Sequence, residues 1–189
     1  MTRRIPIFAT LVVLAAVALM IALGVWQWGR MAEKEALLAR YAAAAGQDGE
    51  VAWPADGAGA EGLLYRRARL ECERVTDRGG VAGRNSRGES GMSQFAECAL
   101  AGGGSARVIL GWSREPTAGQ DWNGGEVRGV IAPGPRLVAD PPLAGLEANA
   151  RPDPSEIANN HFAYAMQWFF FAITALVIYA VALRRRAGS

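Results

Sequence analysis

The residue with the widest chemical range in this chain is its only histidine, His161, at the start of an apolar run in the stretch "NNHFAYAMQW" (159–168). An imidazole can exchange a proton near neutral pH and can bind a metal through either nitrogen. In a helix, residues three, four and seven positions apart share a face. The face that contains the histidine would then be formed by His161, Tyr164, Ala165, Trp168 and Ala172.

This stripe allows three interpretations. An imidazole, two aromatic rings and two small side chains can receive a flat apolar cofactor such as haem. The same stripe can instead pack against a partner helix. His161 can also serve as a cap for the start of its helix, as polar residues at such positions do.

The rest of the chain does not offer the residue types of a common catalytic site. With one histidine, any Ser–His or Cys–His pair must use His161. The stretch "GESG" (88–91) misses the G-x-S-x-G pattern, and "AGGGS" (101–105) lacks the lysine of a phosphate-binding loop. No set of side chains has the spacing of a metal site. We therefore expect a protein that is not an enzyme.

Two uncharged runs are long enough to cross a membrane. Residues 5–25 span roughly 31 Å as a helix, and residues 162–183 are similarly long, against a hydrocarbon core of about 30 Å. The first run exceeds the usual apolar core of a cleaved signal peptide, so we expect it to remain as an anchor. A helix is the only single segment that can span lipid, because it satisfies its own backbone hydrogen bonds.

Charge is distributed unevenly along the chain. All 18 acidic residues lie in 33–156, whereas the outer flanks of the two runs carry only arginines, at positions 3, 4 and 184–186. Flanking arginines favour the cytoplasmic side, so we predict cytoplasmic termini and an external middle domain. No basic patch with interleaved aromatic residues points to nucleic acid. The predicted segments are a cytoplasmic N-terminus (1–4), a first transmembrane helix (5–28), an external domain (29–158), a second transmembrane helix (159–183) and a cytoplasmic C-terminus (184–189).

The middle domain has the pattern of β-strands. Apolar and polar residues alternate in "YRRARLECERV" (65–75), "SQFAECALAG" (93–102) and "ARVILGW" (106–112), and "EVRGVIAPGP" (126–135) is a fourth candidate. We interpret the glycine-rich stretches 45–62, 78–91 and 101–105 as loops and 140–156 as irregular, while 30–42 continues the first helix. The predicted fold class is membrane α+β: a hairpin of two transmembrane helices with an external, antiparallel, β-rich domain between them.

Cys72 and Cys98 both fall on the apolar face of their predicted strands, and the two strands can pair as a hairpin. Outside the cytoplasm such cysteines can form a disulfide. The alternative is two separate buried thiols that act as small apolar side chains.

Four segments resemble a known family. They are "LGVWQWGRMAEKEALL" (23–38), "YRRARLE" (65–71), "VILGWSREP" (108–116) and "NNHFAYAMQWFFFA" (159–172). In this order they resemble the first-helix signature, the first strand, the Gly-Trp strand and the second-helix signature of the Surfeit locus protein 1 family, the cytochrome oxidase assembly factors. The two helix signatures are the specific part of the resemblance. Family members usually carry an arginine where this chain has Leu110.

The resemblance implies a bacterial, non-catalytic assembly factor for haem–copper cytochrome c oxidase, which assists delivery or insertion of haem a into the large catalytic subunit. It implies an inner-membrane protein with a periplasmic domain, whose partners are that subunit, the haem a synthesis machinery and membrane lipid. It also implies His161 as the ligand of haem iron, for which imidazole is a common axial ligand. The residues that it implies as neighbours of the haem are Trp26, Gln27, Tyr164 and Trp168.

Two points stay open at the level of the sequence. A second axial ligand would come from a partner, from a second copy of the chain or from water, because no other histidine is available. The alternative function is a membrane-anchored external module that binds a ligand or a protein without haem, and a visible absorption spectrum of the purified protein distinguishes the two.

Overall fold

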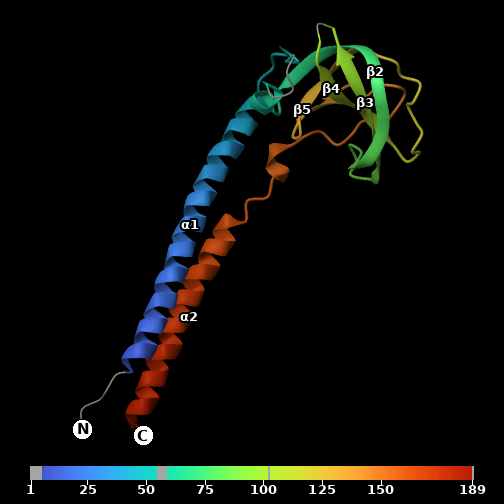
Figure 1. The fold of residues 1–189 in the computed structure, drawn as a ribbon. Coiled ribbons are helices and arrows are strands. Elements are labelled where there is room, and N and C mark those ends of the chain that lie inside the picture. Colours follow the sequence, from blue (N-terminus) through green and yellow to red (C-terminus); the bar gives the residue numbers. More distant parts are fainter. Residues whose placement is uncertain (1–5, 55–58, 102, 189) are drawn as a thin grey trace. The chain divides into compact units, whose positions relative to one another are not determined.

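The computed structural model describes residues 6–54, 59–101 and 103–188. The chain forms two compact units. Residues 1–37 and 158–189 make a helical unit, and residues 38–157 make a unit that is mostly β-sheet. Figure 1 shows the helices and strands that make up each unit.

The helical unit consists of most of α1 (Ile7–Ala45) and all of α2 (His161–Gly188), and both helices are long and apolar enough to cross a membrane. The first begins directly after Pro6, whose ring is pre-set for a helix start, and it ends before Gly46. The second carries Arg185 and Arg186 in its last turn, where positive charge complements the helix dipole. The predicted continuation of the first helix through 30–42 is confirmed.

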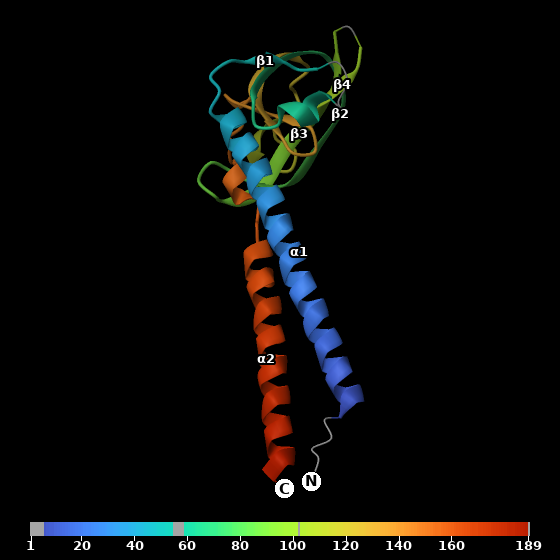
Figure 2. The same ribbon diagram turned by 90° about the vertical axis from the view of Figure 1, so that its left-hand side faces the viewer.

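The prediction of a helical hairpin is wrong. The two helices run alongside each other in opposite directions (Figure 2), but the whole β-rich unit separates them in the sequence. A helical hairpin has a connection of only a few residues. Here two long apolar helices, one near each end of the chain, flank a β domain.

The β-rich unit contains six strands in the part of the chain that the structure describes. They are β1 (Val51–Ala52), β2 (Arg67–Arg84), β3 (Ser90–Leu100), β4 (Ser105–Ser113), β5 (Gly125–Ala132) and β6 (Arg136–Ala139). Two short 3-10 helices, η1 (Gly59–Leu63) and η2 (Pro154–Glu156), lie outside the strands. The short β1 and all but the last residue of η1 fall within 45–62, which we interpreted as a loop.

Five of these strands close into a ring in the order β2-β3-β4-β6-β5, and β5 returns to pair with β2. The long β2 closes the ring because its first part, Arg67–Cys72, pairs with β5 and its second part pairs with β3. The β4–β6 and β1–β2 pairs are parallel and the others are antiparallel. The sheet is therefore mixed, and our prediction of an antiparallel domain is corrected on this point. This order of strands is that of the five-stranded Greek-key barrel called the OB-fold.

The glycine-rich stretch 78–91 is mostly strand, which corrects the predicted loop. Only the turn at 85–89 separates β2 from β3. A Cβ atom at Gly79 would lie 2.8 Å from the ring of Phe95, and one at Gly80 would lie 2.9 Å from the end of Met92. The glycines therefore let side chains of β3 lie against the backbone of β2, instead of forming a turn.

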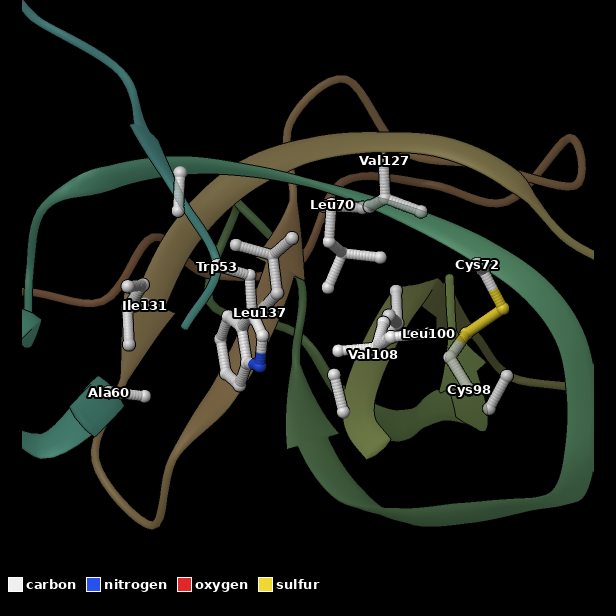
Figure 3. Packing of buried hydrophobic residues seen from close by; sticks show 14 of the residues in the cluster. Trp53, Ala60, Leu70, Cys72, Cys98, Leu100, Val108, Val127, Ile131 and Leu137 are labelled. Atoms are coloured by element: carbon white, nitrogen blue, oxygen red, sulfur yellow. A yellow bond between two sulfur atoms is a disulfide. The ribbon is translucent and has the colours of Figure 1, made fainter. Parts of the chain in front are cut away.

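The core of the barrel confirms the predicted alternation on the first three candidate strands. Alternate residues of β2, β3 and β4 are buried, including both cysteines (Figure 3), and Trp112 is 2% exposed. Ile109 of β4 is buried as well, in a second cluster with Ala132 and Val138. Both faces of β4 are thus covered, which the alternating pattern alone did not indicate. The short strand β6 was also not predicted from the sequence.

Candidate functional site

The candidate site lies between the two helices, along a seam of small residues. The buried residues of this seam are Val17 and Gly24 in α1 and Ala165 and Ala172 in α2. A Cβ atom at Gly24 would lie 2.5 Å from the ring of Phe169. Small residues on facing helices let their backbones approach closely, which is the usual way that helices associate in lipid.

The buried positions of both helices follow a spacing of three and four residues. In α1 the partly or fully buried positions of the seam are Thr10, Val13, Val17, Met20, Gly24, Gln27 and Met31. In α2 they are His161, Ala165, Trp168, Ala172, Ala175 and Tyr179, together with the partly buried Phe169, whose ring lies against Gly24. An average spacing of 3.5 residues keeps one face of each helix turned toward its partner, as in a coiled coil.

Two hydrogen bonds cross this seam at its two ends. The hydroxyl groups of Thr10 and Tyr179 lie 2.5 Å apart, near the chain ends. At the other end, Nδ1 of His161 lies 2.7 Å from Oε1 of Gln27. An amide oxygen only accepts hydrogen bonds, so the imidazole donates its Nδ1–H in this contact.

The contact with Gln27 leaves the other ring nitrogen of His161 without a hydrogen-bond partner among the described residues. When Nδ1 carries the hydrogen of a neutral imidazole, Nε2 carries a lone pair. Histidines that bind metals in proteins almost always have this arrangement, with one nitrogen free and the other held by a hydrogen bond. The chemistry of this side chain therefore fits an axial ligand of haem iron.

Two pairs of aromatic rings lie on the helices of this unit. Trp28 and Phe162 meet edge to face at a centroid distance of 6.2 Å, and Trp168 meets Phe171 in the same way at 6.1 Å. Trp28 and Phe162 follow Gln27 and His161 directly in the chain, and both rings are about half exposed, at 48% and 52%.

Four of the five residues of the predicted stripe lie on the seam between the helices, and the fifth, Tyr164, is exposed. His161, Ala165, Trp168 and Ala172 lie on the seam, so the stripe packs against a partner helix, which was one of the alternatives. Tyr164 is 51% exposed and Trp26 is 57% exposed, so neither is packed into the seam. The described residues contain no group of three or more His, Cys, Asp or Glu side chains that could hold a metal ion.

The sequence pattern did not predict that Gly24, Trp28 and Phe162 contribute to the contacts of the helical unit. The spacing of Gln27, Gly24, Met20 and Val17 along the first helix was the signal that could have found its facing stripe. That signal was hidden because the residues on the outer side of the helix are equally apolar.

The β-rich unit contains the second pair of residues singled out in the sequence. Cys72 and Cys98 form a disulfide, and both are buried (Figure 3). They join β2 to β3 at the point where β2 passes from one partner strand to the other. Leu110, which replaces the arginine usual in the family, is 2% exposed within the same core. It therefore supplies apolar packing and no charge.

A buried asparagine organises the polar groups at the β2–β3 turn. Asn85 is 1% exposed and donates from Nδ2 to Glu89 at 2.7 Å and to Glu147 at 3.2 Å. Arg87 binds the same two carboxylates at 2.9 and 2.8 Å. These hydrogen bonds, first that from Asn85 and then that from Arg87, hold the pKa of Glu89 below its ordinary value.

Two apolar helices, one near each end of the chain, and a mixed β barrel between them define the class of protein, which is compatible with a membrane protein of two spans. The model of the SURF1 family matches residues 14–173, most of the chain. The chain belongs to the SURF1 family, which is associated with cytochrome oxidase assembly. A search of curated proteins found no match.

Proposed function

We propose that this protein is an inner-membrane assembly factor for haem–copper cytochrome c oxidase, which holds haem a at His161 and assists its transfer to the large catalytic subunit. Membership of the SURF1 family supports the assembly function. The observation that carries the haem-binding part is the 2.7 Å hydrogen bond from Nδ1 of His161 to Gln27, which leaves Nε2 available to iron.

The proposed location in the membrane is supported by the surface of the two helices. Phe8 is 81% exposed, Phe170 is 65% exposed and Ile178 is 64% exposed, although all three are large apolar side chains. Exposed apolar surface of this extent is stable in lipid and costs free energy in water. We place both termini in the cytoplasm and the barrel outside it, because the arginines at the outer flanks favour the cytoplasmic side.

Two residues of the seam and an exposed ring pair next to them in the chain would perform three tasks for the cofactor. His161 would supply the axial nitrogen, the ring pair of Trp28 and Phe162 would provide apolar contact, and Gln27 would hold the imidazole. Haem a itself supplies the iron centre on which the oxidase later depends. In this proposal the chain holds and transfers the cofactor without changing it, so it is not an enzyme.

Transfer requires that the cofactor can leave. One histidine supplies only one axial bond, and a haem with one protein ligand is held less firmly than a haem with two. The second position would be filled by water, by a second copy of this chain or by the receiving subunit. In this proposal His161 would be the residue of this chain that holds the haem, and a hold through one residue would let the receiving subunit take the cofactor.

The test is the absorption spectrum of the protein purified in detergent from a host that makes haem a. We expect the wild-type protein to carry haem a and His161→Ala to lose most of it, while both give the same far-ultraviolet circular dichroism. Asn160→Ala is the matched control, because it removes the preceding polar side chain at the start of the same helix, and it should keep the haem. Equal haem occupancy in wild type and His161→Ala would reject His161 as the ligand.

A wild-type protein without any haem would favour the alternative function. The chain would then be a membrane-anchored module that acts on the oxidase through protein contacts alone. The groove on the barrel lined by Phe95, Ile109 and Val138, with a volume of about 550 Å³, gives this alternative a surface. Arginines 84, 107, 136 and 151 also line this groove.

A further inference from the structure

We propose that Gln27 selects the tautomer of His161: it holds the hydrogen on Nδ1 and thereby keeps Nε2 as the nitrogen that can bind iron. This inference rests on the proposed function for its purpose, but the state of the imidazole can be measured without any cofactor. Gln27 would be a positioning residue, since it acts on iron only through His161.

The argument starts from the chemistry of the contact. A neutral imidazole has one hydrogen, and free histidine prefers to carry it on Nε2. In that form the lone pair lies on Nδ1, close to the backbone. The amide oxygen of Gln27 lies 2.7 Å from Nδ1 and can only accept, so in this orientation of the amide the imidazole donates its Nδ1–H.

The surroundings strengthen this selection. Gln27 and His161 are both partly buried, and they lie on helices that pack closely through Gly24 and Ala165. In an apolar environment a lost hydrogen bond is not replaced by water, so the unpaired tautomer is disfavoured more than in solution. The packed helices also limit the rotation of both side chains about the contact.

The contact links the two helices as well as the two side chains. Gln27 belongs to α1 and His161 to α2, and they are 134 positions apart in the chain. In this proposal the first helix therefore favours the iron-binding form of the ligand on the second helix. The site is in this sense shared by the two helices, although only one of them supplies a ligand atom.

The presence of a single histidine makes the test direct. Protein labelled with ¹⁵N at histidine and purified without a histidine tag and without haem contains one imidazole, and its two nitrogen resonances show which nitrogen carries the hydrogen. In mildly alkaline buffer we expect the wild-type protein to carry it on Nδ1. Gln27→Leu, which removes the acceptor at similar size, should shift the population toward Nε2–H. Gln27→Glu keeps an acceptor oxygen and should restore Nδ1–H.

The matched control is Gln167→Leu, which removes an exposed glutamine from α2 and should leave the tautomer unchanged. Binding of haem a gives the second readout. Loss of the group that orients a metal ligand costs about 10- to 100-fold in affinity, so we expect Gln27→Leu to bind haem about 10-fold more weakly or worse. Gln27→Glu and Gln167→Leu should bind it close to the wild-type level.

The outcomes separate this inference from the proposed function. Wild-type protein that carries the hydrogen on Nε2 overturns the inference, and this measurement does not depend on any variant folding. If His161→Ala loses haem while Gln27→Leu binds it like wild type, the proposed function stands and the role of Gln27 is wrong. If wild type has Nδ1–H and Gln27→Leu loses it, the tautomer selection stands even when His161→Ala shows that haem binds elsewhere.

Discussion

At the scale of single residues, Asn85 is a buried amide that shapes a turn and lowers the pKa of a neighbouring carboxyl group. Its Oδ1 accepts from the backbone N–H groups of Arg87 and Glu89 at 3.0 and 2.9 Å, which shapes the turn. Its Nδ2 donates to the Glu89 carboxylate. The turn and the charge network therefore depend on one buried side chain.

The lowered pKa of Glu89 predicts how this network depends on pH. A carboxyl group whose pKa is lower in the folded state stabilises the fold above its ordinary value, here 4.5, and that contribution is lost as pH falls through the folded-state pKa. We expect Glu89→Gln to melt at a lower temperature than wild type at pH 7. The difference should shrink as the pH falls from about 5 toward 3.

Thermal unfolding at a series of pH values checks this prediction. Glu61→Gln is the control for the loss of an exposed carboxylate outside the network, in the short helix η1. A difference between wild type and Glu89→Gln that stays constant from pH 7 to pH 3 would contradict the proposed coupling.

At the scale of elements, close packing of the two helices depends on Gly24. An added methyl group there would overlap the ring of Phe169, whereas a Cβ atom at Gly29 would meet nothing within 4 Å. Overpacking costs about 1–3 kcal/mol, against a gain of about 1 kcal/mol from the better helix propensity of alanine. We expect Gly24→Ala to lower the melting temperature in detergent and Gly29→Ala to leave it unchanged or raise it. Equal effects of the two substitutions would show that the seam does not pack through Gly24.

The sequence predicted the existence of both helices but only one of the two faces that meet. In α2, His161 and Trp168 stand out among apolar neighbours, so their shared face was visible. In α1, the inward Val13 and Val17 are flanked by outward residues of the same kind, such as Leu14. A helix in lipid has no polar outer face, so periodicity does not distinguish its two sides.

Prediction from the sequence was also incomplete for the barrel, for a different reason. Alternation found β2, β3 and β4 because over part of each strand one face is exposed to solvent and the other is buried. It failed at Gly79 and Gly80, because a glycine that admits a neighbouring side chain and a glycine that makes a turn are identical in sequence. The short β6 was missed because four residues are too few to show a period.

At the scale of the whole molecule, the disulfide bears on the proposed topology. A bond between Cys72 and Cys98 persists in an oxidising environment and is reduced in most cytoplasms, so it agrees with a barrel outside the cytoplasm. Closing a loop across a separation of 26 residues stabilises a fold by about 3.5 kcal/mol in the chain-entropy model.

We expect protein alkylated in intact cells to show no free thiol until it is denatured and reduced. Reduction of the wild-type protein should then lower the free energy of unfolding in urea by about 3.5 kcal/mol. The Cys72→Ala, Cys98→Ala double variant is the control, because the reductant should not change its stability. Two thiols that react before reduction would place the barrel in a reducing compartment or leave the bond unformed.

The closed ring of strands also sets an order for events during synthesis. The hairpin of β2 and β3 can form as soon as residue 100 has left the ribosome, because its strands are neighbours in the chain. The other edge of β2 must wait for β5, since Cys72 pairs with Gly125 and Arg67 with Val130. From the emergence of residue 100 to that of residue 130, that edge is a row of unpaired backbone groups, which other growing chains can bind. A growing chain is thus most prone to aggregate after β3 and before β5 has been made, when α1 is already present and α2 has not been synthesised.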